Sequence, residues 1–192
     1  ITKQCSAGCS YCYTNATRTG SMASFDSVQS LLYDLAAAHV FEVALGGGDI
    51  ISYPYLVDIL RLCRDFDIVP NITCKDIDWI RERPEILLLV GQVGVSDEYF
   101  PRRLRSFMDV YKKANLSAHY VMGTSNLSSL KEKLIEANGY DVPVVLLGFK
   151  KIGRGKGYKY LDDYSTWGEM VVSLGRKCPT LAIDTLLAQQ YP

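Results

Sequence analysis

Apolar residues recur at helical spacing in several stretches of the chain, which predicts amphipathic helices. Ser24 or Asp26 can cap the first of them, and Pro54 starts the second. Asn126 can cap a later helix that stops at Gly139. The apolar faces of these helices consist of Val28, Leu31, Leu32 and Leu35, of Leu56, Ile59, Leu60 and Cys63, and of Leu127, Leu130, Leu134 and Ile135. Further helices are expected at Asp76–Arg83, Pro101–Ala114 and Tyr164–Arg176.

Short, strongly apolar runs separate the helices and predict buried strands. The expected strands are Ile1–Lys3, Phe41–Leu45, 67–73, Ile86–Ser96, Ala118–Met122, Val142–Phe149 and Leu181–Asp184. Strands that alternate with helices in this way favour an α/β fold with a parallel sheet covered by helices. The length of 192 residues fits one domain, over residues 1–192, better than two. Because the chain starts at Ile1 rather than Met, we expect it to be a piece of a longer polypeptide.

Composition narrows the class of protein. Hydrophobic residues make up 48% of the chain and charged residues 22%, which is enough to form a sizeable core. The formal net charge is zero, so a general electrostatic attraction to nucleic acid or membrane is not indicated. No apolar run reaches the roughly 18 residues of a membrane span. Six cysteines in a long, core-rich chain do not resemble a disulfide framework, and we therefore expect a reducing cytoplasm.

Three of the six cysteines, Cys5, Cys9 and Cys12, lie close together near the start of the chain. Thiolates prefer zinc, copper(I) or iron–sulfur clusters. A structural zinc site needs four ligands, so that alternative requires one more. The candidates for it are Cys63, Cys74, Cys178 and His39. An iron–sulfur cluster held by three thiolates instead keeps one iron open, which is typical of a catalytic site.

The segment Gly46-Gly47-Gly48-Asp49-Ile50 follows the second expected strand, as the cysteines follow the first. Functional groups in parallel α/β sheets gather at the carboxyl ends of the strands, so both segments should lie on the same rim. A nucleotide P-loop is excluded because no Lys-Ser or Lys-Thr pair follows the glycines.

The spacing Cys5-x3-Cys9-x2-Cys12, with Tyr11 before the last cysteine, resembles the cluster loop of radical S-adenosylmethionine (SAM) enzymes. The glycine segment resembles the GGEP segment of that family, with Asp49 and Ile50 in place of Glu and Pro. The resemblance implies a partial, TIM-like (β/α)6 barrel over essentially the whole chain. It also implies a [4Fe–4S] cluster on the three cysteines, and SAM bound with the help of Tyr11, Gly47, Gly48, Asp49 and Ser96.

In that family the open iron binds the amino and carboxylate groups of SAM. A reduced cluster then cleaves SAM, and the resulting 5′-deoxyadenosyl radical abstracts a hydrogen atom from the substrate. A reductant such as flavodoxin or ferredoxin is the implied partner. The sequence identifies no acid, base or hydrogen donor on the substrate side.

The substrate stays open. A peptide or protein is favoured, because 181–191 resembles the segment that leads into a further cysteine-rich region in peptide-modifying members. A small molecule is an alternative, and RNA is another, supported only by the basic run 150–159 with Arg102, Arg103 and Arg105. Such runs are usually solvated loops, so neither nucleic acid nor a membrane is expected as a partner. A non-catalytic iron–sulfur or zinc module is the alternative to an enzyme.

Overall fold

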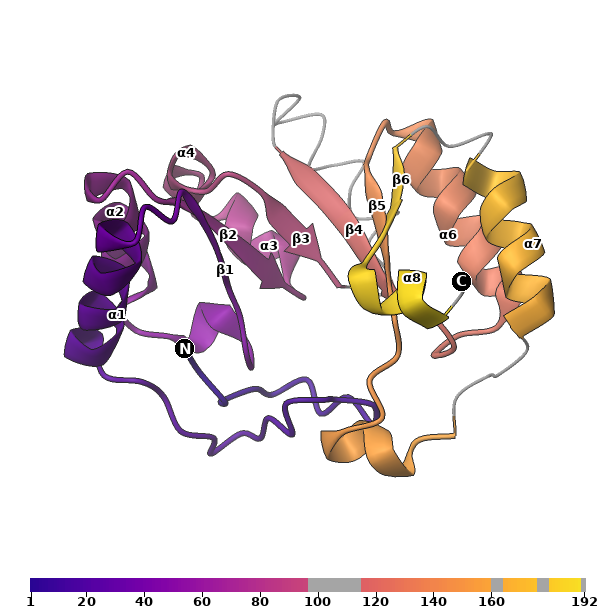
Figure 1. Ribbon diagram of the computed structural model, residues 1–192, viewed down its shortest axis with the longest axis horizontal. Helices are drawn as coiled ribbons and strands as arrows, with labels where there is room; N and C mark the ends of the chain where they lie inside the picture. The colour runs from indigo at the N-terminus through magenta and orange to yellow at the C-terminus, as the bar shows by residue number, and fades with distance from the viewer. Residues whose placement is uncertain (97–114, 160–163, 176–179, 191–192) are drawn as a thin grey trace.

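The computed structural model describes residues 1–96, 115–159, 164–175 and 180–190. Six parallel strands form one sheet, in which neighbouring strands follow chain order. They are β1 (Glu42–Leu45), β2 (Val69–Cys74), β3 (Val93–Val95), β4 (Leu116–Val121), β5 (Val144–Leu147) and β6 (Leu181–Ile183). The sheet bends into an arch, with α1 and α2 outside one end and α6 and α7 outside the other (Figure 1). The predicted α/β class and partial (β/α)6 barrel are confirmed.

Two of the helices begin at the caps that the sequence predicts. The described helices are α1 (Phe25–Ala37), α2 (Leu56–Asp65), α3 (Ile77–Arg81), α4 (Glu85–Leu89), α6 (Leu127–Gly139), α7 (Tyr164–Gly175) and α8 (Thr185–Gln190), with the 3₁₀ helices η1 (Ile50–Ser52) and η2 (Gly153–Gly157). Ser24 caps α1 by accepting a hydrogen bond from the backbone N–H of Ser27 at 3.2 Å. Asn126 caps α6 in the same way, with the N–H of Ser129 at 2.8 Å. Both predicted caps are confirmed.

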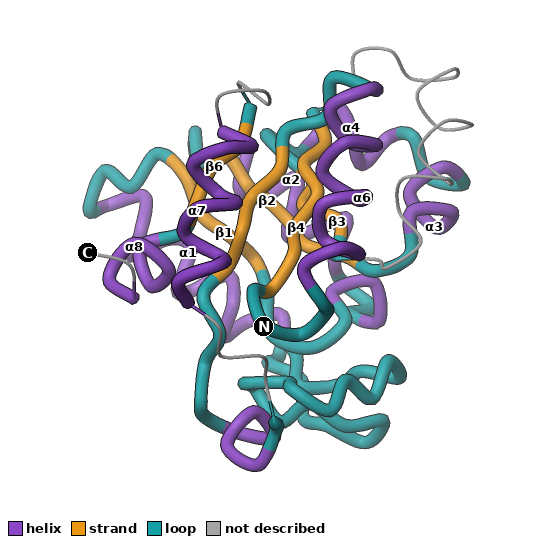
Figure 2. Tube along the Cα trace, turned by 90° about the vertical axis from the view of Figure 1, so that its right-hand side faces the viewer, coloured by secondary structure: helices purple, strands orange, loops and turns teal. Residues whose placement is uncertain are grey.

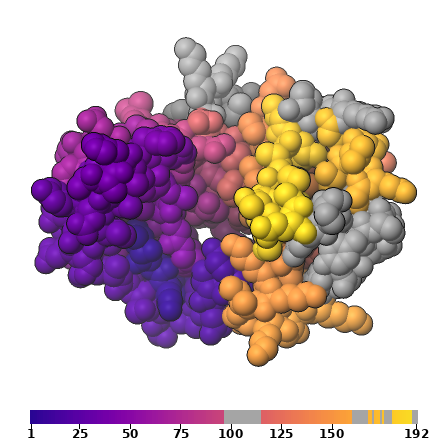
Figure 3. Space-filling model, in the orientation of Figure 1, coloured from indigo at the N-terminus to yellow at the C-terminus, as the bar shows by residue number. Residues whose placement is uncertain are grey.

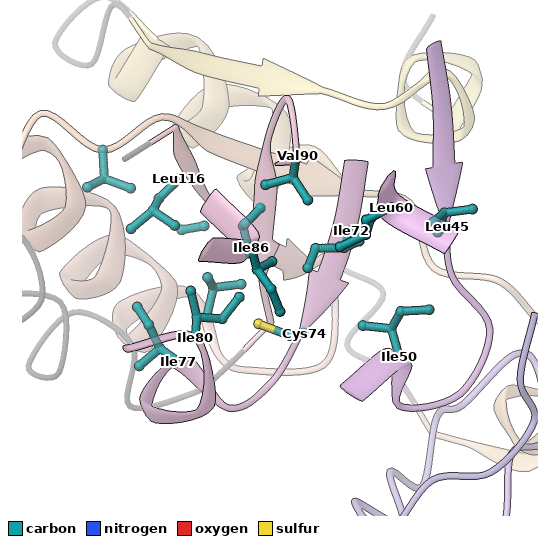
Figure 4. Packing of buried hydrophobic residues seen from close by; sticks show 14 of the residues in the cluster. Leu45, Ile50, Leu60, Ile72, Cys74, Ile77, Ile80, Ile86, Val90 and Leu116 are labelled. Carbon is teal, nitrogen blue, oxygen red and sulfur yellow. The ribbon is translucent and has the colours of Figure 1, made fainter. Parts of the chain in front are cut away.

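The core lies between the sheet and the helices outside it. The predicted apolar face of α2 is at most 2% exposed at each of Leu56, Ile59, Leu60 and Cys63. Figure 4 shows Cys74 of β2 among apolar side chains from α3, α4 and the neighbouring strands. Thr73, between two buried residues of β2, is exposed and faces the other side of the sheet, as strand alternation requires. Long loops gather at one end of the strands (Figure 2).

The expected long strand Ile86–Ser96 is wrong. Its first part is helix α4, and only Val93–Val95 forms a strand. Pro84 has helical backbone angles and occupies the N-cap position, where its missing N–H is not needed. Three leucines follow Ile86, and leucine favours helix more than β-branched residues do. Ile86 is fully buried, whereas Leu88 is 83% exposed, so the helix buries one face only.

Other expectations differ in smaller ways. The first expected strand, Ile1–Lys3, is reduced to isolated bridges, in which Thr2 pairs with Gly47 and Met22. Leu31 and Ile135 are exposed rather than part of the apolar faces of their helices. Helix α8 is not among the expected elements; Asp184 caps it by accepting the N–H of Leu187 at 2.7 Å.

The expected helix Pro101–Ala114 lies outside the described residues. None of the helices in the described part of the chain is long and apolar enough to cross a membrane.

Candidate functional site

A cavity of about 420 Å³ opens at the carboxyl ends of the strands. Residues that follow β1, β2, β3, β5 and β6 line it, together with the cysteine segment and the end of β4. Figure 3 shows a hollow at this place, between the N-terminal part of the chain and the part near residue 150. All eight site residues predicted from the sequence line this one cavity: Cys5, Cys9, Tyr11, Cys12, Gly47, Gly48, Asp49 and Ser96.

The three cysteines lie on residues 5–17, which we name the cysteine loop. Backbone hydrogen bonds tie its two ends to each other and to the preceding residues: Cys5 N–H donates to Thr17 at 2.8 Å, and Thr17 N–H donates to Lys3 at 3.1 Å. The three thiols are free of disulfides and half-buried. Within the described residues, no three His, Cys, Asp or Glu side chains are already gathered as a metal site.

The thiol of Cys12 lies among hydrogen-bonding groups of the loop. Burial acts to raise the pKa of its thiol, but hydrogen bonds outweigh this effect. The Thr14 hydroxyl lies 3.2 Å from the Cys12 sulfur. Backbone groups of Ala16 and Thr14 and the positive charge of Arg154 act in the same direction. The pKa of Cys12 is therefore lowered, which favours the thiolate that binds metal.

Backbone meets backbone at Gly47 and Gly48. The N–H of Gly48 donates to Thr2 at 2.5 Å, and the N–H of Asp49 donates to Gln4 at 2.8 Å. A Cβ atom would lie 2.3 Å from the Thr2 carbonyl oxygen at Gly47 and 2.2 Å from the Gln4 carbonyl oxygen at Gly48. Gly47 also has a φ of +129°, which L side chains rarely adopt. The glycines thus fix the start of the cysteine loop against the end of β1.

Asp49, which follows these glycines, faces the cavity beside Lys75. Burial raises the pKa of its carboxyl group. A backbone hydrogen bond at Ile51 acts against this rise; the Asp76 carboxylate adds to it, and Lys75 opposes it. A positively charged ammonium group bound in the cavity would offset this cost of burial, so the carboxyl group is suited to pairing with one.

Ser96 and Tyr11 enter the cavity from distant parts of the chain. Ser96 directly follows β3, and its N–H donates to the Cys74 carbonyl at 2.9 Å. Tyr11 meets Tyr158 edge to face, with ring centroids 5.6 Å apart. Phe149 stacks on the same Tyr158 ring, with centroids 5.7 Å apart. An aromatic wall thus stands beside the cysteine loop, and the sequence identifies only Tyr11 of it.

Arg154 is a site residue that the sequence does not reveal. In the sequence, Arg154 is one cation of the basic run 150–159, which is expected to be a solvated loop or a rim that binds RNA. Its Nε donates to the Cys9 carbonyl at 2.9 Å, and its Nη1 donates to the Ala16 carbonyl at 2.8 Å. Its backbone N–H donates to the Cys12 carbonyl at 3.0 Å. No local pattern could have signalled this, because the partners lie more than a hundred residues away in sequence.

His119 is the second residue that the structure adds. It points inward from β4, and its ring lies over Gly94 of the adjacent strand, where a Cβ atom would be 2.3 Å from the ring. Its Nε2 lies 3.0 Å from the Ser117 hydroxyl. Burial lowers the pKa of His119, which keeps the imidazole neutral at neutral pH. Strand alternation predicts only that either His119 or Tyr120 faces inward.

The remaining cysteines fit packing better than ligation. Cys63 is fully buried on α2, and burial raises the pKa of its thiol to about 11. Cys74 is 2% exposed and packs with apolar side chains, although it also touches the cavity (Figure 4). His39 is exposed and does not line the cavity, and Cys178 lies outside the described residues. A fourth zinc ligand from Cys63 or His39 is therefore not supported.

Comparison by sequence gives no relatives: no protein-family model matches the chain, and no curated protein matches it. Comparison with solved structures, in contrast, finds similar proteins. SuiB from Streptococcus suis bound to the precursor peptide SuiA is 17% identical, with a TM-score of 0.76 over 95% of this chain. SuiB bound to S-adenosylmethionine is 16% identical, with a TM-score of 0.73 over 95%. SuiB alone is 15% identical, with a TM-score of 0.69 over 94%.

The chain spans about half the length of SuiB: the matched region makes up 46% to 48% of the SuiB chain in these structures. At such low identity the likeness concerns the fold. The parallel sheet in chain order and the cavity at its carboxyl end agree with that likeness. The chain has the fold of SuiB, in agreement with the partial (β/α)6 barrel expected from its sequence.

Proposed function

We propose that this chain is the core of a radical SAM enzyme. The main support is that Cys5, Cys9 and Cys12 line one cavity with the glycine segment, on the fold of a protein that has been seen with SAM bound. Three thiols suit an iron–sulfur cluster, because soft thiolates bind iron and three of them leave an open position.

The proposed cofactors are a [4Fe–4S] cluster on the three cysteines and SAM. Reductive cleavage of SAM to a 5′-deoxyadenosyl radical, which takes a hydrogen atom from the substrate, is the chemistry that this pair would supply. The protein would bind and orient these cofactors and the substrate, and it would exclude water from the site. Because the pKa of Cys12 is lowered, less free energy is needed to deprotonate its thiol for metal binding.

The chain's own residues have distinct parts in holding SAM. Asp49 offers a partly buried carboxylate for the amino group, and Gly47 and Gly48, which lie directly against the Thr2 and Gln4 carbonyls, hold the backbone that carries it. Ser96 offers a hydroxyl at the end of β3, where it can bind a ribose oxygen. Tyr11 offers a ring face from the aromatic wall. These assignments follow the family resemblance, residue by residue.

A peptide or protein is the proposed substrate. The support is the likeness to SuiB, which has been seen with its precursor peptide. A reductant such as flavodoxin or ferredoxin would supply electrons, and a reducing cytoplasm suits both cluster and thiols. The RNA alternative loses part of its support, because Arg154 at the centre of the basic run is engaged with the cysteine loop.

Anaerobic reconstitution tests the proposal. The protein is loaded with iron and sulfide, reduced with dithionite and given SAM; 5′-deoxyadenosine is measured by chromatography, and EPR spectra are taken before and after SAM. We expect deoxyadenosine and a SAM-dependent EPR change. Alanine at Cys5, Cys9 or Cys12 should abolish both, whereas Cys63→Ala, a matched control in the core, should keep them. A cluster that is indifferent to SAM, or bound zinc in place of iron, would contradict the proposal.

The role of Asp49 has its own test. Asp49→Asn should weaken SAM binding to the reconstituted protein by about tenfold or more, because a charge-assisted hydrogen bond contributes about 1.5–3 kcal/mol. Asp49→Glu, which restores the family's residue, should keep affinity. Asp58→Asn, on the exposed side of α2, is the control. Equal affinities for all variants in equilibrium dialysis would remove Asp49 from the SAM site.

A further inference from the structure

Arg154 joins the two ends of the partial barrel. The sheet is open between β1 and β6, because no strand in the described residues joins these two edges. Figure 1 shows the N-terminal loop and η2 meeting below this opening. Arg154 lies in η2, and its side chain donates hydrogen bonds to the cysteine loop across this opening.

The contacts of Arg154 are directed at backbone, not at acidic side chains. It donates to the carbonyl oxygens of Cys9 and Ala16 through its side chain and to that of Cys12 through its N–H. Its Nη1 also lies 3.5 Å from the Asn15 side-chain oxygen. The carbonyls belong to residues on both sides of Tyr13, and a guanidinium can hold them together because its donors form a rigid planar fork.

The backbone around Arg154 is shaped for this contact. Gly153 has a φ of +56°, and a Cβ atom there would lie 2.5 Å from the Tyr13 carbonyl oxygen. At Gly155 a Cβ atom would lie 2.5 Å from the Lys150 carbonyl oxygen. Glycine on either side therefore lets η2 lie directly on the cysteine loop. Lys150 adds a contact over the ring of Tyr13, 4.3 Å from its centroid.

We propose that Arg154 is the positioning residue of the cysteine loop. By holding the carbonyls of Cys9 and Ala16 it fixes the path of the chain between the last two cysteines and beyond, so that the thiols are presented to one cavity before any metal arrives. Its positive charge also stands beside the site where a cluster with thiolate ligands carries negative charge. This inference rests on the proposed function for the metal, but the clasp itself, meaning the set of Arg154 contacts with the loop, is a property of the metal-free chain.

Hydrogen exchange on the metal-free protein tests the clasp directly. The amides of Cys5, Cys12, Asn15 and Thr17 are bonded within the loop region. Arg154→Gln should speed their exchange by about tenfold or more, because hydrogen bonds from a charged group are lost. Lys156→Gln, an exposed residue of the same 3₁₀ helix, should leave exchange unchanged. Unchanged exchange in Arg154→Gln would overturn the proposal.

A second readout separates positioning from general support of the fold. After reconstitution, Arg154→Gln should bind less iron and release it faster to a chelator. The cluster that is still bound should have a lower reduction potential, because a nearby positive charge is gone. Arg154→Lys keeps the charge and one donor group, and it should restore the potential and part of the iron. Wild-type iron content and potential in Arg154→Gln would refute the role. If Arg154→Gln does not fold, Arg154→Lys takes its place. Faster exchange of the loop amides than in wild type then supports the clasp, and wild-type exchange refutes it.

The two hypotheses fail in different ways. If wild-type protein binds iron but does not cleave SAM, the proposed function fails, while the exchange data still decide on the clasp. If wild-type protein cleaves SAM and Arg154→Gln matches it in exchange, iron and potential, the clasp fails and the proposed function stands.

Discussion

The cysteine loop is held on two sides, by different means. On the side of β1, Gly47 and Gly48 let two backbone segments approach so closely that no side chain fits between them. On the side of η2, one long side chain, that of Arg154, reaches across and collects carbonyl groups. The first contact depends on the absence of atoms and is rigid. The second combines close approach at Gly153 with hydrogen bonds from the Arg154 side chain, which has many rotamers, so those hydrogen bonds can be removed by one substitution without moving the sheet.

The glycine side should show the largest effect of a single added methyl group. Gly47→Ala combines a φ of +129° with a contact of 2.3 Å to the Thr2 carbonyl oxygen, which also accepts the N–H of Gly48, and we expect it to lower the free energy of unfolding by about 3 kcal/mol. At the adjacent Gly46 an added methyl group would have nothing within 4 Å, so Gly46→Ala is the matched control, expected within about 0.5 kcal/mol. Urea unfolding followed by circular dichroism measures both. Equal losses would mean that close approach is not what this side needs.

The η2 side should respond less to the same change. Gly153→Ala meets the Tyr13 carbonyl at 2.5 Å with a φ of +56°, but η2 is a short helix between loops and can shift. We expect a loss of about 1–2 kcal/mol in the same unfolding experiment. Gly157→Ala, with nothing within 4 Å, serves as its control. A loss larger than that of Gly47→Ala would reverse the comparison.

Thr14 adds a side-chain contact between the cysteine loop and the glycine side. Its hydroxyl donates to the Gly47 carbonyl at 3.3 Å and lies 3.2 Å from the Cys12 sulfur. Thr14→Val removes both contacts at nearly constant shape and should lower the free energy of unfolding by about 0.5–1.5 kcal/mol. Thr14→Ser keeps the hydroxyl and should stay closer to wild type. If valine is neutral, the close backbone approach at the glycines holds this side without the Thr14 hydroxyl.

The smallest expected effect is on how the free energy of unfolding changes with pH, where Asp49 and Cys12 should act in opposite directions. The raised pKa of Asp49 means that its stabilising contribution is present below about pH 4 and is lost as pH rises through the folded-state pKa. The lowered pKa of Cys12 acts the other way: its contribution is present above about pH 9 and is lost as pH falls through the folded-state pKa.

Asp49→Asn should therefore remove a loss of stability between acidic and neutral pH. Cys12→Ser should remove a gain between neutral and alkaline pH. Denaturant unfolding of the metal-free protein at a series of pH values measures both. Two slopes of the same sign would contradict the burial of Asp49 or the hydrogen bonding of Cys12 as the cause of its shift.

The glycine side of the loop can be predicted from the sequence, whereas the arginine side cannot. Gly47 and Gly48 are recognisable because a run of glycines after a strand has few other uses, and its place in the chain sets its place in the fold. Cys5, Cys9 and Cys12 are close in sequence, and their spacing alone suggests one site. All of them line the cavity. These are local patterns, and they do not depend on how distant parts of the chain come together.

Residues whose roles depend on distant parts of the chain could not be identified from the sequence. Arg154 looks like its neighbours Lys151 and Lys156 until the fold brings the cysteine loop to it. His119 gains its place from Gly94 on the adjacent strand. The apolar run after Pro84 fits strand or helix equally well in sequence, and only the exposure of Leu88 shows that one face is left to solvent. Each case needs the relative placement of two elements, which one stretch of sequence does not contain.

The clasp also sets an order of events during synthesis of the chain. Arg154 and Cys9 are 145 residues apart, so a chain released only as far as β4 carries all three cysteines of the loop but lacks the residue that holds their backbone. Contacts between such distant residues form late, because the intervening chain must first lose its freedom. The thiols are the first part of the site to be made and among the last to be put in order, and metal is best delivered after the ring has closed.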